Sequence, residues 1–394
     1  MVSNRFSTLR SKGLSVVNAA LASFYFLSTI GCSSPTASGC TLHLVGPRPS
    51  EPISILSYDE NGHASQVDSI LPSDSVHVIQ CNENQLLILS INGSPLYFIA
   101  EKGVVVIDFK DGAVRGTPLN DAKLKFETTY NKLLSSASAK YDSVATISEL
   151  SLDDKNAELA QLSNREARRI TDYVMSQVLN NKDNAFGQFA FLFGIAKNSL
   201  IGAEDYDRFL AKAGSNVSEF PPVHSATTLL HNAVATSVGC DIKDISVVTS
   251  DGLSSQLTSL IDTVAINVIH VFNPYNGSTP KTLHLISHIK NEVKRLERQA
   301  NNNSNVDLSN TVASHHIIFL SVCEYVDEDI VKKITQRFNL DWTMVADSNA
   351  LFVQEYGITS LPYFIIVDGN SKIEERGVGE DALFNWVYSK IYIK

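Results

Sequence analysis

The sequence predicts an α+β multidomain protein, in which an N-terminal antiparallel β sandwich or barrel precedes a helical middle segment and a C-terminal α/β domain. Two observations predict this class. The chain has 394 residues, which exceeds the usual size of one small domain. The apolar spacing also changes along the chain, from alternation to helical periodicity and then to long apolar runs between amphipathic helices. We place these segments at residues 41–118, 119–240 and 241–394.

Composition and charge narrow the classes of partner. Hydrophobic residues make up 44% of the chain and charged residues 19%, as in an ordinary globular protein. The formal net charge is -10 at pH 7. Because a phosphate backbone requires a basic face, this charge argues against a nucleic-acid partner. The short basic run at 290–298 is typical of a solvated helix face.

The first 31 residues differ from the rest of the chain. Arg5, Arg10 and Lys12 precede an uncharged apolar run at 14–30. A basic region followed by an apolar region and small residues is typical of a secretory signal, which we place at residues 1–31. The run is also near the minimum length of a membrane-spanning helix, so a retained membrane anchor is the alternative.

The residues that follow resemble a bacterial lipoprotein signal. TIGC ends at Cys32, and this resemblance implies that Cys32 is lipidated and becomes the first residue of the mature chain. ASGC, ending at Cys40, fits the same local pattern and is the second candidate. Residues 32–40 then form a tether without an acidic run. The resemblance implies a lipid anchor in the cell envelope of a Gram-negative bacterium, facing the periplasm.

Short apolar alternations separated by turn residues predict the strands of the β domain. The candidates are TLHLVG, ISILSY, SVHVIQC, QLLILSI, PLYFIA and VVVIDF. The segment VRGTPLND at 114–121 then leads into a helical pattern. It resembles the exit motif of an N-terminal β domain of unknown function that precedes a thioredoxin domain in many bacterial lipoproteins.

The middle segment has the apolar spacing of helices. Ser163 is a candidate N-cap for the amphipathic stretch that follows it. The aromatic run at 186–193 is more typical of a core than of a cofactor site. The segment is predicted to be a helical spacer.

The C-terminal segment alternates strands and helices. VAINVIHVF, HHIIFLSVC and YFIIVD are apolar strands, amphipathic helices follow the first two, and a hairpin and a helix end the chain. GITSLPYFIIVDGNSKI resembles the thioredoxin segment that contains a cis-proline, which places Pro362 at that position. ISVVTSDGLSSQLTSLI resembles the leading hairpin of TlpA-like thiol–disulfide reductases. This resemblance implies a thioredoxin-like fold.

The chemistry departs from that family. There C-x-x-C begins the helix after the first central strand, where the helix N-terminus stabilises the thiolate. Here the stretch VFNPYNGSTPK holds Asn276 and Thr279, or in the other frame Tyr275 and Ser278, and 241–322 contains no sulfur. Ser278 or Thr279 is expected to cap the helix, and Pro280 suits its first turn.

The remaining histidines and cysteines that could react or bind a metal are more typical of structural residues. His284 and His288 lie four residues apart on one predicted helix, and two histidines do not complete a metal site. The remaining cysteines, at 40, 81, 240 and 323, are too far apart for a zinc site or a C-x-x-C pair. Cys323 is either a lone reactive thiol or a buried one. We expect no cofactor and no metal.

Three functions remain open from the sequence. The first is a redox-inactive thioredoxin-like lipoprotein that binds an envelope protein or peptide in a groove beside Pro362, lined by Tyr275, Asn276, Tyr363 and Trp342. The second is a thiol-dependent oxidoreductase or peroxidase-like enzyme that uses Cys323, alone or paired with Cys240. The third is a purely structural envelope component whose β domain is the binding part. We favour the first and therefore expect no enzyme activity.

Overall fold

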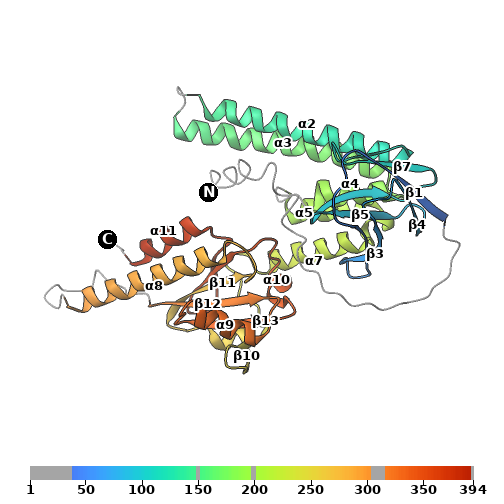
Figure 1. Ribbon diagram of the computed structural model, residues 1–394. Coiled ribbons are helices and arrows are strands. Elements are labelled where there is room, and N and C mark those ends of the chain that lie inside the picture. The colour runs from blue at the N-terminus through green and yellow to red at the C-terminus, as the bar shows by residue number, and fades with distance from the viewer. Residues whose placement is uncertain (1–37, 148–150, 197–200, 303–315, 392–394) are drawn as a thin grey trace. The chain divides into compact units, whose positions relative to one another are not determined.

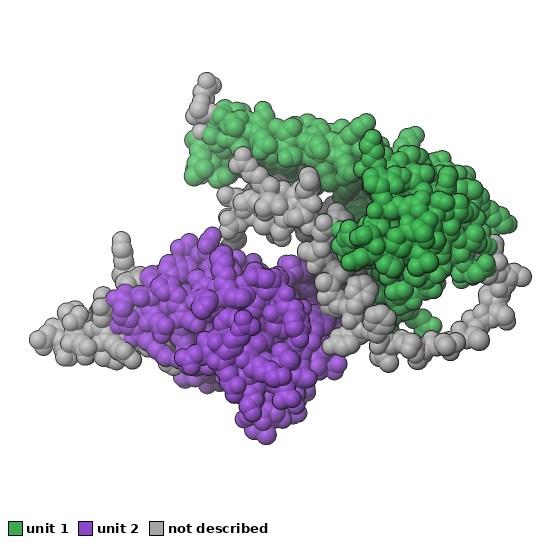
Figure 2. Space-filling model, in the orientation of Figure 1, with its two compact units in different colours: residues 1–227 green, residues 228–394 purple. Residues whose placement is uncertain are grey.

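The computed structural model describes residues 38–147, 151–196, 201–302 and 316–391 (Figure 1). The predicted signal at 1–31 and Cys32 lie outside these residues. The chain forms two compact units, residues 1–227 and 228–394 (Figure 2). None of the helices in the described residues is both long enough and apolar enough to span a bilayer.

The first unit begins with two four-stranded sheets. Their strand orders are β4-β1-β7-β8 and β3-β2-β5-β6. The first sheet contains β1 (Ser38–Val45), β4 (Val76–Cys81), β7 (Val104–Asp108) and β8 (Ala113–Arg115). The second contains β2 (Ile53–Tyr58), β3 (Ala64–Ile70), β5 (Leu86–Ile91) and β6 (Ser94–Ile99).

One core lies between these sheets, so the β domain is a sandwich and not a closed barrel. Leu42 and Leu44 of β1 are buried while His43 between them is exposed, which is the alternation of a strand with one buried face. These leucines pack in one cluster with Ile55 of β2 and Leu89 of β5, from the other sheet. The predicted all-antiparallel arrangement is wrong in one pair, because β1 and β7 run parallel.

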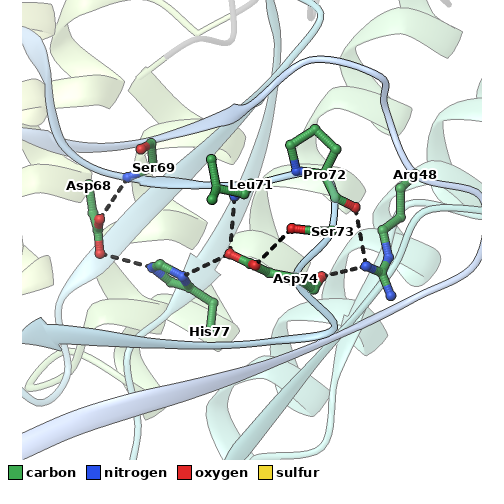
Figure 3. A network of polar contacts seen from close by, with 8 residues as sticks. All are labelled: Arg48, Asp68, Ser69, Leu71, Pro72, Ser73, Asp74 and His77. Atoms are coloured by element: carbon green, nitrogen blue, oxygen red, sulfur yellow. Dashed lines mark hydrogen bonds and ion pairs between the residues drawn. The ribbon is translucent and has the colours of Figure 1, made fainter.

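A polar network holds the corner between β3 and β4, which belong to different sheets (Figure 3). His77 Nε2 lies 2.9 Å from an Asp68 carboxylate oxygen. Asp74 accepts a hydrogen bond from the Leu71 backbone N–H, and its own carbonyl accepts one from Arg48. Since His77 is largely buried, this network satisfies polar groups that the edge of the sandwich would otherwise leave unpaired.

The exit from the sandwich explains the VRGTPLND motif. Gly116 has φ +98°, and a Cβ there would lie 2.7 Å from the Val104 carbonyl oxygen. The Asn120 side chain is fully buried and bonds both the N–H and the C=O of Ile99, at 2.9 and 2.8 Å. The Glu101 carboxylate accepts from the first backbone N–H groups of the following helix. The motif therefore joins sheet and helix through buried hydrogen bonds.

Helices complete the first unit, and Figure 1 shows the two longest lying side by side. They are α2 (Pro118–Ala145), α3 (Leu152–Asn180), α4 (Ala185–Phe191), the π-helix η1 (Leu192–Ala196), α5 (Ala203–Ala213), α6 (Ser215–Ser218) and α7 (Pro221–Ala235). Ser151, and not Ser163, caps α3, because its hydroxyl accepts from Asp154 N–H. Phe126 of α2 packs against Phe186 and Phe189, so the aromatic run is core.

The second unit is built on a seven-stranded sheet of order β10-β9-β13-β12-β11-β14-β15. Its strands are β9 (Ser246–Thr249), β10 (Ser254–Gln256), β11 (Ala265–Phe272), β12 (His316–Glu324), β13 (Thr343–Asp347), β14 (Tyr363–Val367) and β15 (Ile373–Arg376). Its helices are the 3₁₀ turn η2 (Leu257–Leu260), α8 (Thr279–Asn302), α9 (Glu328–Arg337), α10 (Leu351–Glu355) and α11 (Glu380–Ile391). Strands β11, β12 and β13 are parallel, and β14 and β15 are antiparallel to their neighbours.

Two cores cover the faces of this sheet. On one face, Val268 and Phe364 pack with Ile286 of α8 and Leu383 of α11. On the other face, Ile269 and its neighbours pack with α10 and η2. The end of α7 also belongs to this unit, because the Arg376 guanidinium donates to the carbonyls of Ala233 and Thr236.

Candidate functional site: the turn after strand β11

The candidate site lies where β11 ends and α8 begins. All eight residues of β11 are buried, and the strand lies between β12 and β14 in the sheet. The turn at 273–278 therefore lies at the C-terminal edge of the parallel strands. In α/β sheets, ligands bind at this edge.

Hydrogen bonds within the chain hold the turn in shape. Asn273 Oδ1 accepts from Tyr275 N–H at 2.9 Å, and its carbonyl accepts from the Thr279 hydroxyl at 2.7 Å. Asn276 Oδ1 accepts from both the N–H and the hydroxyl of Ser278, each at 3.0 Å. The polar side chains of this turn thus build its backbone conformation.

The helix start differs from the expected cap. Ser278 precedes α8, but its hydroxyl donates to Asn276 instead of accepting from the helix. The Thr279 hydroxyl is buried and donates back to Asn273. The hydrogen-bond partners of these hydroxyls are an amide and a backbone carbonyl, so among the described residues neither hydroxyl is paired with a base that would make it a nucleophile. Pro280 lies in the first turn, as predicted.

The strand register brings the turn and Pro362 to the same edge of the sheet. Val271 of β11 pairs with Tyr363 of β14, so the residues after Val271 and those before Tyr363 lie next to each other. The Leu361–Pro362 peptide bond is cis. In the part of the chain that the structure describes, the backbone N–H and C=O groups of Ser360 and Leu361 have no hydrogen-bond partner.

The four predicted binding residues differ in what they offer a ligand. Tyr275 is 74% exposed, and Asn276 is also exposed. Pro362 is half-buried beside the free backbone groups. Tyr363 packs against the core that contains Ile269, on the face of the sheet covered by α10 and η2. Its hydroxyl accepts a hydrogen bond from Arg376 Nε at 2.9 Å. The structure therefore brings Tyr275, Asn276 and Pro362 to one edge, whereas the Tyr363 hydroxyl is already engaged.

The placement of Trp342 in the groove is wrong. Its indole N–H donates to the Ser321 hydroxyl at 2.9 Å, and Lys290 of α8 lies over its ring. Ser321 lies on β12 and Lys290 on α8, and Trp342 directly precedes β13, at the end of the parallel strands opposite to Pro362. The sequence does not show this, because the side of a strand that a flanking residue faces depends on long-range pairing.

A cleft beside the turn was not anticipated from the sequence. It has a volume of about 180 Å³ and lies between the start of α8 and α9. Pro274, Pro280 and Phe338 form apolar walls, and the exposed basic residues Lys333 and Arg337 stand at its rim. The amphipathic KKITQRF stretch was the only signal in the sequence that pointed to it.

The two histidines of α8 are residues of its solvent face. His284 and His288 are exposed, and their rings contact Phe338 and Phe384 at 6.0 and 6.1 Å. The described residues contain no group of three or more His, Cys, Asp or Glu side chains that is placed to hold a metal ion.

Cys323 is not placed for thiol chemistry. Its side chain is fully buried among Phe272, Leu283 and Val331, and burial raises the pKa of its thiol. Cys240 flanks β15 through a backbone hydrogen bond to Ile373. Cys240 lies on the outer side of β15, and β11 and β14 lie between β12 and β15, so the two cysteines are more than about 14 Å apart, too far for a disulfide.

Buried ionisable groups lie below this edge. Glu324 and Asp347 are directly paired at the ends of β12 and β13, and both are buried. Burial, together with the nearby Asp347 carboxyl, raises the pKa of Glu324 to about 9. His270 is fully buried, lies 3.2 Å from the Ser321 hydroxyl, and has a pKa lowered to about 3 by burial. Both side chains are therefore neutral at pH 7.

These elements define a class of fold. A β-α-β unit, followed by an antiparallel hairpin and a helix, with a cis-proline before the hairpin and a turn at the helix start, is the thioredoxin-like arrangement. The second unit thus has a thioredoxin-like fold. The turn and the start of α8, residues 273–280, contain no cysteine.

No family model and no curated protein matches the chain. Among solved structures, a thioredoxin-like protein from Bacteroides caccae is 11% identical, with a TM-score of 0.38 over 60% of this chain and 82% of that one. A thiol:disulfide interchange protein from Bacteroides sp. is 16% identical (TM-score 0.32, 40% and 91%). The thioredoxin domain of a thiol-disulfide oxidoreductase from Bacteroides vulgatus is 17% identical (TM-score 0.28, 39% and 98%).

Proposed function

We propose that this chain is a cell-envelope lipoprotein whose thioredoxin-like domain binds an extended protein or peptide segment beside Pro362 and does not exchange disulfides. The observation that carries the proposal is the pair of residues before Pro362, Ser360 and Leu361, whose backbone groups are free at the edge of the sheet. Backbone groups of this kind bind an extended chain by strand addition.

Side chains at the same edge support binding. The exposed Tyr275 ring offers a rigid apolar surface that is enriched in recognition sites. The cleft beside the turn has apolar walls with Lys333 and Arg337 at its rim. Their charge favours a bound segment that carries an acidic side chain near an apolar one.

The second unit does not place two reactive thiols together, as dithiol–disulfide exchange requires. The side chains of Asn276 and Thr279 form hydrogen bonds within the turn. The Cys323 thiol is buried, and burial raises its pKa. A thiol with a raised pKa is a poor nucleophile at neutral pH. Insulin reduction by the purified chain is therefore expected to stay at the buffer rate. Turnover that disappears in Cys323→Ser would overturn the proposal in favour of the oxidoreductase.

A backbone-directed variant tests strand addition. Ser360→Pro removes one free N–H, whereas Ser360→Ala keeps it and is the matched control. Reduced, carboxymethylated lactalbumin is a permanently unfolded probe for fluorescence-anisotropy titration. We expect Ser360→Pro to weaken its binding roughly tenfold, which corresponds to one charge-free backbone hydrogen bond of about 1.4 kcal/mol, and Ser360→Ala to bind like the wild type.

A surface variant provides a second reading of the same site. Tyr275→Ala is expected to weaken binding of the unfolded probe. Leu253 is an exposed apolar residue on the β9–β10 turn, and Leu253→Ala is expected to leave the affinity for the probe unchanged. If all four variants bind the probe with the same affinity as the wild type, the binding site does not lie at this edge of the sheet.

The lipid anchor rests on the sequence at Cys32. The structure bears on the second candidate, Cys40, which is only 2% exposed inside β1. A lipid on Cys40 would have to open the core of the sandwich. Metabolic labelling with a fatty-acid analogue is expected to mark the wild type and to fail in Cys32→Ala; label that persists in that variant would contradict the assignment.

A further inference from the structure

The two cysteines of the β sandwich lie on neighbouring strands. In the β1–β4 pair, Ser38 faces Cys81 and Cys40 faces Ile79, so Cys40 and Cys81 are diagonal neighbours. They are two residues apart in register and therefore on the same face of the sheet. Cys40 is buried in the sandwich core, and Cys81 is half-buried against the same cluster. Forty residues of sequence separate two thiols that the fold brings together.

The thiols interact directly. The Cys81 thiol lies 3.8 Å from the Ile79 carbonyl oxygen, to which it donates, and hydrogen bonds with Cys40 lower its pKa to about 7. The same contact raises the pKa of Cys40, since its proton is held as the donor. Cys81 is the more exposed of the two and is the thiol that a disulfide reaches first, whereas Cys40, at 2% exposure, is placed to resolve the mixed disulfide from inside the sandwich.

We propose that Cys40 and Cys81 are a redox-active pair that reacts with low-molecular-weight disulfides and closes to an intramolecular disulfide between β1 and β4. The Cys81 thiolate attacks one sulfur of the disulfide RS–SR and releases RS⁻, which leaves a mixed disulfide on Cys81. The Cys40 thiol then passes its proton to RS⁻ and attacks the Cys81 sulfur, and the second RS⁻ leaves and is protonated by solvent. The protein thiols lose two electrons, and one RS–SR becomes two RSH.

The strands allow the sulfur atoms to meet. Diagonal neighbours have Cα atoms about 7–8 Å apart, slightly more than the usual range in disulfides, so closure requires a small approach of the two strands. Among the strands that the structure describes, β4 is the edge strand of its sheet. Gly39, which has no side chain to reposition, directly precedes Cys40. The required shift is therefore confined to one edge of the sandwich.

The other described cysteines provide matched controls. Cys240 is also half-buried, but its thiol contacts only the Ser237 hydroxyl, at 3.5 Å. Cys323 is buried in a cluster that contains no second cysteine among its described residues. Disulfide formation driven by exposure alone would involve Cys240, whereas formation driven by the pairing of strands involves Cys40 and Cys81.

Peptide mapping after oxidation tests the proposal. The reduced full chain is incubated with oxidised glutathione at pH 7, alkylated with iodoacetamide, digested and analysed by mass spectrometry. We expect a linked Cys40–Cys81 peptide in the wild type and in Cys240→Ser. In Cys40→Ser, glutathione is expected to remain on Cys81, and in Cys81→Ser, Cys40 is expected to stay a free thiol.

The rate of alkylation tests the role of the Cys40 donor. Without glutathione, Cys81 is expected to react with iodoacetamide roughly tenfold faster than Cys240 at pH 7, because a larger fraction of it is thiolate. Cys40→Ser keeps a donor and preserves this rate, whereas Cys40→Ala loses it. A wild-type chain in which Cys81 reacts no faster than Cys240 and no linked peptide forms would overturn the proposal, and this reading needs no variant to fold.

Discussion

At the scale of single residues, buried polar side chains do much of the positioning. Asn120 is the clearest case, because its carboxamide satisfies both backbone groups of Ile99 and also donates to Thr117 Oγ1 at 2.8 Å. These bonds join the last strands of the sandwich to the first turn of α2. An aliphatic side chain of the same size would leave the Ile99 groups buried and unpaired.

Asn120→Ala is therefore expected to lower the free energy of unfolding by about 2–4 kcal/mol, since two buried backbone groups lose their partners. Urea unfolding followed by far-UV circular dichroism measures this loss. Asn164→Ala, on the exposed side of α3, is the control, with an expected change of less than about 0.5 kcal/mol. Equal losses in the two variants would contradict the role of the buried amide.

Glu324 makes stability depend on pH in a defined direction. Its folded pKa of about 9 lies above the ordinary value of 4.5, so the folded state holds a proton that the unfolded state has released. The stability it contributes is complete below pH 4.5 and is lost as the pH rises towards 9. The free energy of unfolding changes through this group by at most about 1.4 kcal/mol per pH unit.

Glu324→Gln removes this titration and keeps the shape of the side chain. We expect the variant to lose less stability than the wild type between pH 5 and pH 9, as measured by urea unfolding followed by tryptophan fluorescence. Both tryptophans, Trp342 and Trp386, lie in the second unit and report on it. Parallel pH profiles for the two proteins would show that the Glu324 carboxyl is not held neutral.

At the scale of elements, periodicity was reliable where it was strong. The buried run of β11, the amphipathic α8 and the β9–β10 hairpin all form near their predicted positions. Among the elements that were not predicted are β3, β13 and α10. β3 is an exposed edge strand with a polar sequence, and the other two have five residues each. Elements of this kind form because neighbouring strands and the core complete their hydrogen bonds and packing, which local sequence does not record.

Arg376 shows how one side chain fixes an element. Its guanidinium donates to the carbonyls of Ala233, Thr236 and Tyr356, which ties the end of α7 to β15. Arg376→Ala is expected to cost about 3 kcal/mol of unfolding free energy in the tryptophan-reported transition, because charged hydrogen bonds to partly buried carbonyls are lost. Arg337→Ala removes an exposed arginine of the same unit and is the matched control. A loss no larger than that of the control would mean that the end of α7 is held by other contacts.

At the scale of the whole molecule, two compact units each have cores of their own. The sandwich core combines residues from both of its sheets, and the thioredoxin-like unit has a core on each face of its sheet. The boundary falls within α7, at 227/228. The second unit is therefore expected to include the end of a helix that precedes its first strand.

A truncation series tests this boundary. A fragment of residues 228–394 retains the acceptors of Arg376 and is expected to unfold with the same tryptophan-reported midpoint as the full chain. A fragment of residues 241–394 lacks the acceptors Ala233 and Thr236 and is expected to be less stable by about 2–3 kcal/mol. Identical midpoints for the two fragments would show that the end of α7 contributes nothing to this unit.

The sequence by itself determined the order of the main elements, the place of the degenerate turn and the position of Pro362. These depend on local periodicity and on turn residues, which adjacent positions record. Only the tertiary structure decided that Trp342 lies under α8, that Cys323 is enclosed, and that Cys40 meets Cys81. Strand register and the choice of sheet face depend on packing between segments far apart in the chain, and a shift of one residue reverses every side chain.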